Sequence, residues 1–368
     1  MTDTKDPAST RERSERAWMR RALVLAERGW GQTAPNPMVG AVVVRDGVIV
    51  GKGFHARYGE AHAEVAALAE AGERARGATV VVTLEPCNHH GKTPPCVDAL
   101  VAAGVKRVVA AVRDPGREAS GGAERLRAAG IEVEFGIEEA AARELNAPFF
   151  FAASGAARPW VTLKLAVSLD GAIAGTAPDS PRWLTGEAAR KYVHRMRANS
   201  DAIAVGIGTA LADDPQLTVR QGKRPRIAPM RVVFDRAARL PLASRLVKTA
   251  KRIPTIVMTD QADAPAARVL AAKGVTVESV PGLLPKLEVL RGRGVRSLLV
   301  EGGSVLAGAL LGAKAVDRLV IFQAPVLLGA GSLPVFGGVD GIERLTVIER
   351  RELGADLMTV FAMTVSDE

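Results

Sequence analysis

Short apolar runs alternate with amphipathic segments along the first half of the chain. The apolar runs are continuous, which is typical of buried strands, and they cover residues 39–44, 48–53, 78–84 and 105–112. Helical spacing of apolar positions, each time followed by a glycine, predicts helices at residues 15–28, 63–71 and 96–103. Because strands and helices alternate, this half is expected to form an α/β sandwich with helices on both faces of its sheet.

The second half shows the same alternation after a change of composition, from three phenylalanines to small residues. Strands are expected at residues 160–166, 202–205, 231–234, 255–258, 297–300 and 318–322. Helices are expected at residues 187–199, 263–273, 283–292 and 304–312. The sequence therefore predicts a loose tail at 1–13, a first domain at 14–148, a linker at 149–158 and a second α/β domain at 159–368.

Composition supports a globular protein of two domains. The chain has 368 residues, of which 48% are hydrophobic and 24% charged. Its formal net charge of +9 favours polyanionic partners, either nucleic acid or phosphorylated small molecules. The basic residues are scattered, and no basic stripe with stacking aromatics is evident, so phosphorylated metabolites are the expected partners and nucleic acid is not.

The expected cellular location of the protein follows from the absence of long apolar stretches. No run of 18 apolar residues occurs, which excludes a membrane-spanning helix. Arg20-Arg21 and the apolar residues after them resemble a twin-arginine signal, but the run is short and ends at Glu27. An amphipathic helix explains it better, and a cytoplasmic protein is expected.

The candidate chemistry lies in three short motifs of the first half. They are His62-Ala63-Glu64, Glu85-Pro86-Cys87 and Pro94-Pro95-Cys96, and they contain the chain's two cysteines. A disulfide between the cysteines is possible by count, but a metal pair is favoured in a chain without an export signal. One imidazole and two thiolates suit a zinc ion with a fourth position open to water. The carboxylate of Glu64, two residues from His62, is the candidate proton carrier.

These motifs resemble the signature of zinc-dependent base deaminases, in which a cysteine pair follows H-x-E. That signature separates the cysteines by two residues, whereas eight separate Cys87 from Cys96. The longer run from Glu85 to Cys96 resembles the deaminase domain of the bifunctional deaminase–reductase family of riboflavin biosynthesis. Residues 35–40 and 59–64 are similar to that family too. Asn88 and Lys92 stand where the family usually has Ser and often has Arg.

The resemblance implies residues that hold the substrate of the deaminase. His89 and His90 could serve as zinc ligands, but with three ligands placed, a role facing the substrate or stabilising the loop is favoured. The implied substrate-binding residues are Asn36, His89, His90 and Lys92.

The second half gives weaker signals by itself. It has no G-x-G-x-x-G after a strand, so a Rossmann site is not supported. Val300-Glu301-Gly302-Gly303-Ser304 reads as a strand, a glycine pair and a helix start, which suits either a phosphate site or an ordinary turn. Residues 164–171, 183–185, 209–215 and 300–310 resemble the reductase domain of the same family. That resemblance implies a dihydrofolate-reductase-like α/β fold that uses NADPH.

Site residues of the reductase are carried over by position. The implied cofactor-binding residues are Ala166, Trp183, Thr209, Asp213, Arg236, Gly303, Ser304, Val305, Leu306, Ala307, Gly308 and Ala309. The implied substrate-binding residues are Ser180, Arg197, Leu217, Arg220 and Glu301, with the chain one residue longer than the family pattern near Ser180. Arg197 and Arg220 are expected to clamp a 5′-phosphate. The alternatives are a solvated helix face for Arg197, a surface loop for Arg220 and a core position for Trp183.

The expected function is therefore bifunctional. The zinc site would deaminate 2,5-diamino-6-(5-phosphoribosylamino)pyrimidin-4(3H)-one, and the second domain would reduce the ribosyl group of 5-amino-6-(5-phosphoribosylamino)uracil to ribityl. A homodimer or higher homo-oligomer is also expected. The alternatives are a zinc deaminase of other bases or RNA with a non-catalytic second domain, and a purely structural zinc domain. The latter would need a fourth protein ligand.

Overall fold

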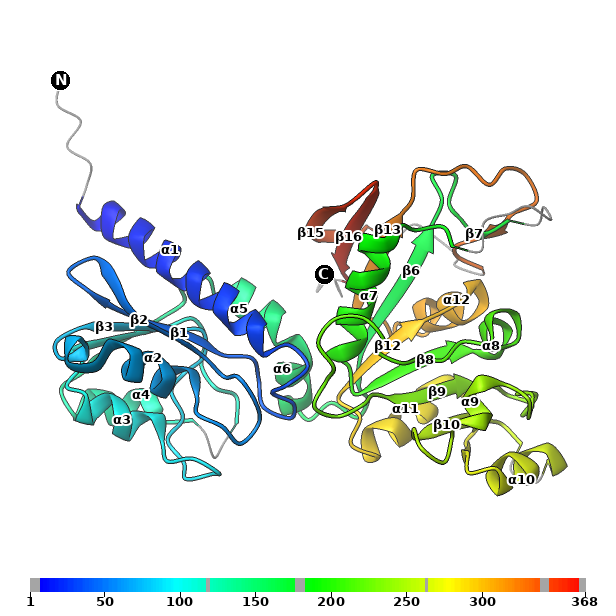
Figure 1. Ribbon diagram of the computed structural model, residues 1–368, viewed down its shortest axis with the longest axis horizontal. Helices are drawn as coiled ribbons and strands as arrows, with labels where there is room; N and C mark the ends of the chain where they lie inside the picture. The colour runs from blue at the N-terminus through cyan, green and yellow to red at the C-terminus, as the bar shows by residue number, and fades with distance from the viewer. Residues whose placement is uncertain (1–6, 117–119, 176–182, 262–263, 338–343, 364–368) are drawn as a thin grey trace. The chain divides into compact units, whose positions relative to one another are not determined.

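The computed structural model describes residues 7–116, 120–175, 183–261, 264–337 and 344–363. The chain divides into two compact units, residues 1–155 and residues 156–368 (Figure 1). None of the helices in the described part of the chain combines the length and the hydrophobicity needed to cross a bilayer.

The first unit is built on a five-stranded sheet of order β2-β1-β3-β4-β5. Its strands are β1 (Gly40–Arg45), β2 (Val48–Phe54), β3 (Thr79–Val82), β4 (Arg107–Ala110) and β5 (Glu132–Phe135). β1 runs antiparallel to both β2 and β3, whereas β3, β4 and β5 are parallel. The parallel half of the sheet explains why its valine-rich strands are buried on both faces.

Helices cover both faces of this sheet, as the alternation of elements predicts. The helices are α1 (Pro7–Ala26), η1 (Glu27–Gly29), α2 (Ala63–Ala71), η2 (Gly72–Ala75), α3 (Cys96–Ala102), α4 (Gly122–Ala128), α5 (Glu139–Leu145) and α6 (Ala147–Ala153). One core cluster joins α1 and α5 to the sheet, and another joins α2, α3 and α4 to the opposite face. The helices come close because β1 and β2 carry glycines. A Cβ on Gly53 would lie 2.1 Å from the carbonyl oxygen of Ala63.

The second unit contains a nine-stranded sheet of order β11-β10-β9-β8-β12-β6-β13-β16-β15, and β14 pairs with β7 separately. The seven strands from β11 to β13 are parallel, and β16 and β15 are antiparallel to their neighbours. The strands are β6 (Trp160–Val167), β7 (Ala172–Ala174), β8 (Ala202–Gly206), β9 (Met230–Phe234), β10 (Thr255–Thr259), β11 (Thr276–Ser279), β12 (Ser297–Glu301), β13 (Arg318–Gln323), β14 (Leu333–Pro334), β15 (Thr346–Leu353) and β16 (Asp356–Ala362).

Helices also cover both faces of the second sheet, and three core clusters connect them to it. The helices are α7 (Glu187–Ala198), α8 (Ile207–Asp213), α9 (Arg245–Lys248), α10 (Pro265–Ala272), α11 (Leu283–Gly292) and α12 (Ser304–Gly312). The parallel strands β6, β8, β9, β10 and β12 all end at one edge, which is where ligands bind in open α/β sheets.

Two segments expected to be irregular are helical. Residues 7–13 belong to α1, in which Arg11 and Arg16 form i,i+4 ion pairs with Glu15 and Glu12; residues 1–6 of the expected tail lie outside the described residues. The expected linker at 149–158 is partly α6, and the units divide between Gly155 and Ala156. The β15–β16 hairpin was not predicted, because β15 mixes charged and apolar residues, most of them exposed, and no continuous apolar run marks the strand.

Candidate active sites

Three metal-ligating atoms converge at one end of the first sheet. One ligand atom from each of His62, Cys87 and Cys96 lies within 4.8 Å of the others. His62 Nδ1 is 3.2 Å from Cys96 Sγ and 3.5 Å from Cys87 Sγ. Ligands at about 2.1 Å (N) and 2.3 Å (S) from a tetrahedral zinc ion would be roughly 3.6 Å apart, so the donor set fits zinc.

The local fold brings these ligands together from three segments. His62 is the N-cap residue of α2, Cys87 lies in the loop after β3, and Cys96 begins α3. The backbone N–H of Cys96 donates to Cys87 Sγ at 3.4 Å. Hydrogen bonds with Cys96 and then with His62 lower the pKa of Cys87, against the opposing effect of burial. A thiolate, the form that binds metals, is therefore favoured.

Glu64 lies next to this cluster, on the first turn of α2. Its side chain is only 3% exposed, and it lines the same cavity as His62 and Cys87. Burial raises the pKa of Glu64 to about 7, and the neighbouring Cys87 adds to the rise. Because Glu64 is offset from His62 by two residues at a helix start, it reaches the cavity without occupying the ligand position of His62.

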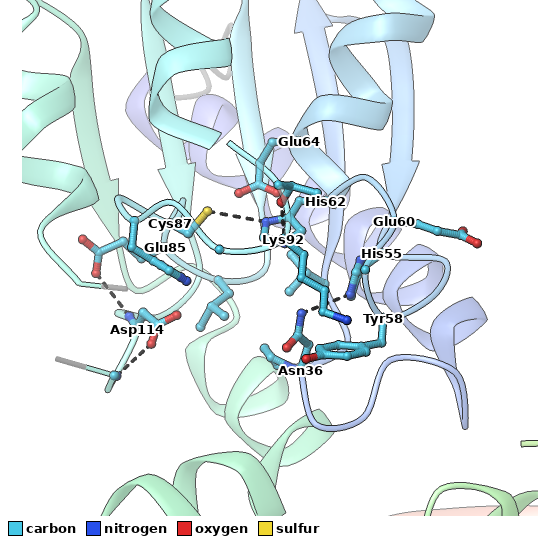
Figure 2. Close-up of a pocket in the computed structure, with 18 of the residues that line it drawn as sticks. Asn36, His55, Tyr58, Glu60, His62, Glu64, Glu85, Cys87, Lys92 and Asp114 are labelled. Atoms are coloured by element: carbon cyan, nitrogen blue, oxygen red, sulfur yellow. Dashed lines mark hydrogen bonds between the residues drawn. The ribbon is translucent and has the colours of Figure 1, made fainter. Parts of the chain in front are cut away.

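The cluster opens into a cavity of about 740 Å³, which we call the deaminase cavity. Figure 2 shows Asn36, His55 and Tyr58 on one side and Glu85 and Asp114 on the other, with His62 and Glu64 between them. Of the residues predicted to hold the substrate, Asn36, His89 and Lys92 line the cavity. His90 does not, because the loop between the cysteines turns it outward into an exposed position. A role of His90 in holding the substrate stays a prediction that this cavity does not support.

Two sets of hydrogen bonds position Asn36, one through the backbone of Met38 and one to its own side chain. The side chain of Asn146 bonds both the N–H and the C=O of Met38 at 2.8 Å, which anchors the loop that carries Asn36. His55 lies beside Asn36, with its Nε2 3.4 Å from Asn36 Nδ2 and its Nδ1 3.2 Å from the carbonyl oxygen of Ala61. Burial lowers the pKa of His55, so the neutral ring accepts from Asn36 and donates to Ala61.

Several residues that line this cavity were not predicted from the sequence, His55 among them. The Lys92 ammonium lies 4.5 Å from the centroid of the Tyr58 ring, a cation–π contact at the rim. On the opposite side, buried Glu85 accepts from the backbone N–H groups of Asp114 and Ala123. The Glu85-Pro86-Cys87 motif could have identified Glu85 as a site residue. No local sequence pattern identifies His55, Tyr58 or Asp114.

A second, larger cavity of about 1770 Å³ lies at the carboxyl edge of the second sheet, and we call it the reductase cavity. Predicted residues that line it are Ala166, Trp183, Arg197, Thr209, Asp213, Leu217, Arg220, Arg236, Glu301, Gly303, Ser304, Val305, Leu306 and Ala309. Trp183 is 62% exposed, which overturns the core alternative. Ser180 lies outside the described residues.

Two of the predicted cofactor residues on α12 do not line the reductase cavity. Ala307 is fully buried in the core, and Gly308 packs against the chain at Gly337, whose carbonyl oxygen would lie 1.8 Å from a Cβ on Gly308. Neither residue lines the cavity, because one helix presents only one face to it. Their neighbours Ser304, Val305, Leu306 and Ala309 form that face.

Arg197 is neither a solvated surface residue nor a free phosphate clamp. Its Nε donates to Glu301 Oε1 at 2.5 Å and its Nη2 to Glu301 Oε2 at 2.8 Å, while Nη1 donates to the carbonyl oxygen of Thr218 at 3.1 Å. The two-donor edge expected to grip phosphate therefore holds Glu301. Burial raises the pKa of Glu301, but the charge and hydrogen bonds of Arg197, together with the charge of Lys164, outweigh it, and the net pKa is lowered.

Lys164 also lines the reductase cavity and was not predicted as a site residue. It lies opposite Glu301 in the pairing of β6 with β12. Burial lowers the pKa of Lys164, with the Glu301 charge opposing the change. The alternation of partly exposed and buried residues along β6 could have identified it, since Lys164 shares a face with Ala166.

The fold and the first cavity define a zinc-binding deaminase domain joined to a reductase domain. Residues 12–112 match the model of the cytidine and deoxycytidylate deaminase zinc-binding region, and residues 159–359 match the RibD C-terminal domain. The chain belongs to the RibD family, the bifunctional deaminases and reductases of riboflavin biosynthesis. This confirms the predicted fold class and the predicted pair of activities.

Relatives resemble the chain over most of its length. The riboflavin biosynthesis protein RibD of Aquifex aeolicus is 42% identical over 94% of this chain and 98% of its own. That of Mycobacterium tuberculosis (strain H37Rv) is 45% identical over 81% of each. A solved RibD structure from Acinetobacter baumannii is 39% identical with a TM-score of 0.80, covering 96% of this chain and 99% of that one. A deaminase/reductase structure from Thermotoga maritima, 35% identical, has a TM-score of 0.81 at the same coverage.

Proposed function

We propose that His62 Nδ1 and the sulfurs of Cys87 and Cys96 hold one zinc ion, and that Glu64 moves protons beside it. The convergence of these three ligand atoms next to a buried carboxylate, at the wall of one cavity, is the observation that carries the proposal. When bound, zinc activates a water for attack at neutral pH, because it lowers the pKa of that water from about 15.7 to roughly 7.

Glu64 then has two tasks in the deamination. It accepts the proton of the attacking water, and it returns a proton to the substrate so that the amino group leaves as ammonia. The proposed substrate is 2,5-diamino-6-(5-phosphoribosylamino)pyrimidin-4(3H)-one, in line with the deaminase activity in the name of the Thermotoga relative. Asn36 would bond the polar edge of the pyrimidine, and His89 and Lys92 would hold the phosphorylated ribose.

The reductase cavity is proposed to bind NADPH and 5-amino-6-(5-phosphoribosylamino)uracil. NADPH, when bound, supplies the hydride that C1′ of the ribose receives. The start of α12 after Gly303 presents backbone N–H groups, and Arg236 presents a cation at the end of β9. Trp183 and Thr209 complete the cofactor side. Arg220 and Leu217 are assigned to the substrate.

Lys164 and Glu301 are proposed to serve the sugar. As hydride adds to C1′, the bond from C1′ to the ring oxygen breaks and that oxygen must gain a proton. The Lys164 ammonium faces the cavity beside Glu301 and is placed to donate it, while Glu301 is held by Arg197 to bond the ribose hydroxyls. In the proposed reaction sequence, the first unit deaminates the base and the second unit then reduces the sugar.

Zinc removal tests the deaminase assignment. Purified protein is expected to contain one zinc per chain, and a chelator is expected to abolish deamination and leave reduction of supplied 5-amino-6-(5-phosphoribosylamino)uracil intact. Metal content and both activities are measured on the same sample. Active protein without zinc, or a His62→Ala variant that keeps its metal, would contradict the ligand assignment.

Replacement of Lys164 tests its proton donation. Lys164→Met is expected to lower the reductase kcat by about 10- to 100-fold, because a charge-assisted hydrogen bond to the leaving oxygen is lost. The deaminase activity serves as the control for folding. A variant that reduces the substrate at the normal rate would exclude Lys164 as the donor.

The proposal also covers the location and the oligomeric state of the protein. Cysteines that bind zinc as thiolates are consistent with the reducing cytoplasm, and the resemblance favours a homodimer or higher homo-oligomer. Light scattering after gel filtration would measure the oligomeric state. The alternative of a base or RNA deaminase with a non-catalytic second domain is not favoured, because the reductase family model covers that domain.

A further inference from the structure

A histidine of α7 to which the proposed reaction assigns no role contacts the loop assigned to the substrate. His194 is 6% exposed and lines the reductase cavity (α7, green in Figure 1). Its Nδ1 accepts the backbone N–H of Arg220 at 3.2 Å. Arg220 is the last residue of the segment 214–220, which we call the substrate loop and which also carries Leu217.

The substrate loop has a backbone that must be held in place. Asp214 and Leu217 have φ angles of 40° and 48°, in the left-handed region that non-glycine residues rarely adopt. Leu217 is nevertheless buried. Such a conformation persists only where surrounding contacts determine it, so the side chains that bond this loop decide where its substrate residues point.

Several side chains supply those contacts at successive points of the loop. The backbone N–H of Arg245 donates to Asp214 Oδ1 at 2.8 Å, and Arg231 Nη1 lies 3.5 Å from the carbonyl oxygen of Gln216. Arg197 Nη1 donates to the carbonyl oxygen of Thr218. His194 then bonds Arg220 itself, at the residue whose side chain is assigned to the phosphate.

The bond requires a neutral imidazole with its proton on Nε2, since Nδ1 must accept. The charged groups around the ring enforce this state. Arg197 faces it from the same helix, Arg220 from the loop and Glu301 from β12. Burial, and then the two guanidinium charges, lower the pKa of His194 to about 4, while Glu301 opposes them. The ring therefore stays an acceptor across the neutral range.

We propose that His194 is a positioning residue of the reductase site, a neutral acceptor that fixes the backbone of Arg220 and thereby aims its guanidinium at the phosphorylated substrate. The inference rests on the proposed function, because that function assigns Arg220 to the phosphate. To the proposed function it adds a residue that orients Arg220 toward the phosphate. That residue, His194, thereby contributes to the preference for a phosphorylated sugar.

Two substitutions separate the acceptor from mere packing. Asparagine can place an oxygen near the position of Nδ1, whereas leucine fills similar space without an acceptor. His194→Leu is expected to raise the reductase KM for 5-amino-6-(5-phosphoribosylamino)uracil by about tenfold and to change little for the dephosphorylated compound. His194→Asn is expected to stay within about threefold of the wild type. The deaminase activity of each variant reports whether the chain is intact.

A double-mutant cycle of Arg220→Ala and His194→Leu distinguishes failure of the Arg220 assignment from failure of the His194 proposal. If Arg220→Ala leaves the KM for the phosphorylated substrate unchanged, the proposed phosphate role of Arg220 fails. If Arg220→Ala raises it and His194→Leu does not, only the role of His194 fails. In a protein that already carries Arg220→Ala, we expect His194→Leu to cause no further rise in the KM for the phosphorylated substrate.

Nitrogen NMR of the wild-type protein keeps the proposal testable if a variant does not fold. The chain has five histidines, and the signals of His194 are those lost in His194→Asn or, failing that, those that respond to bound substrate. An unprotonated Nδ1 and a protonated Nε2 from pH 5.5 to 8 are expected. A protonated Nδ1 anywhere in that range would overturn the proposal, because it cannot accept from Arg220.

Discussion

Replacing Glu64 with glutamine is expected to lower kcat for deamination by about 10³-fold or more, while zinc content stays at one per chain. Glutamine has the shape of glutamate but neither accepts nor returns a proton. The residue is buried at the wall of the deaminase cavity and is not one of the three clustered ligand atoms. The loss should therefore fall on the chemical step and not on the metal.

The matched control is Glu70→Gln, an exposed glutamate on the same helix, which should deaminate at the wild-type rate. Reduction of supplied 5-amino-6-(5-phosphoribosylamino)uracil should be normal in both variants, because the reductase cavity belongs to the other unit. Ammonia release, NADPH oxidation and metal content are measured together. Normal deamination by Glu64→Gln would exclude the proton-transfer role, and loss of zinc would make Glu64 part of the metal site.

The second large effect concerns the buried ion pair of the reductase cavity. Arg197→Ala is expected to destabilise the second unit by about 3 kcal/mol, since it leaves the Glu301 carboxylate buried without its main partner. For a domain of this size the melting temperature should fall by roughly 6–12 °C. Reductase activity should fall with it, because Arg197 holds both Glu301 and the carbonyl oxygen of Thr218.

The pH dependence of that loss follows from Glu301. In the wild type, Arg197 holds the pKa of Glu301 below its ordinary value, so the pair stabilises the fold above that value and the stabilisation is lost on acidification. In Arg197→Ala, burial is expected to raise the pKa, so the variant suffers most at neutral pH. The stability difference should shrink as the pH falls from the ordinary carboxyl pKa of about 4.3 through the lowered pKa of Glu301, below which the carboxyl is protonated in both proteins.

Two comparisons make the interpretation specific. Lys191→Ala, at an exposed position of the same helix, should leave the melting temperature unchanged. Arg197→Met combined with Glu301→Leu should recover stability without recovering reduction, because an apolar pair can replace a buried ion pair. Equal stability of Arg197→Ala and the wild type at pH 7 would show that the pair contributes nothing, and Arg197 would then be available to the substrate.

The position of Arg197 changes which arginines of this cavity are assigned to the substrate phosphate. The sequence suggested two arginines acting together, whereas the structure commits the two-donor edge of Arg197 to Glu301. Arg220 is left as the guanidinium assigned to the phosphate, on a loop held by His194. We therefore propose that the residues that bind the substrate and the residues that orient them are different.

The sequence by itself determined the chemistry of the first unit. His62, Glu64, Cys87 and Cys96 are residue types that few sites other than a hydrolytic zinc centre combine, and short motifs fix their local spacing. The alternation of strands and helices likewise determined both α/β units. Local patterns suffice here because strand and helix periodicity, turn residues and ligand chemistry act over a few residues.

Only the tertiary structure decided what depends on side chains brought together from distant segments. His55 beside Asn36, Arg197 paired with Glu301 across 104 positions, and His194 bonded to Arg220 leave no local pattern. The outward turn of His90 and the burial of Ala307 likewise follow from how a loop and a helix face pack. These contacts form when elements dock, because direction and burial are properties of the packed fold and not of neighbouring residues along the chain.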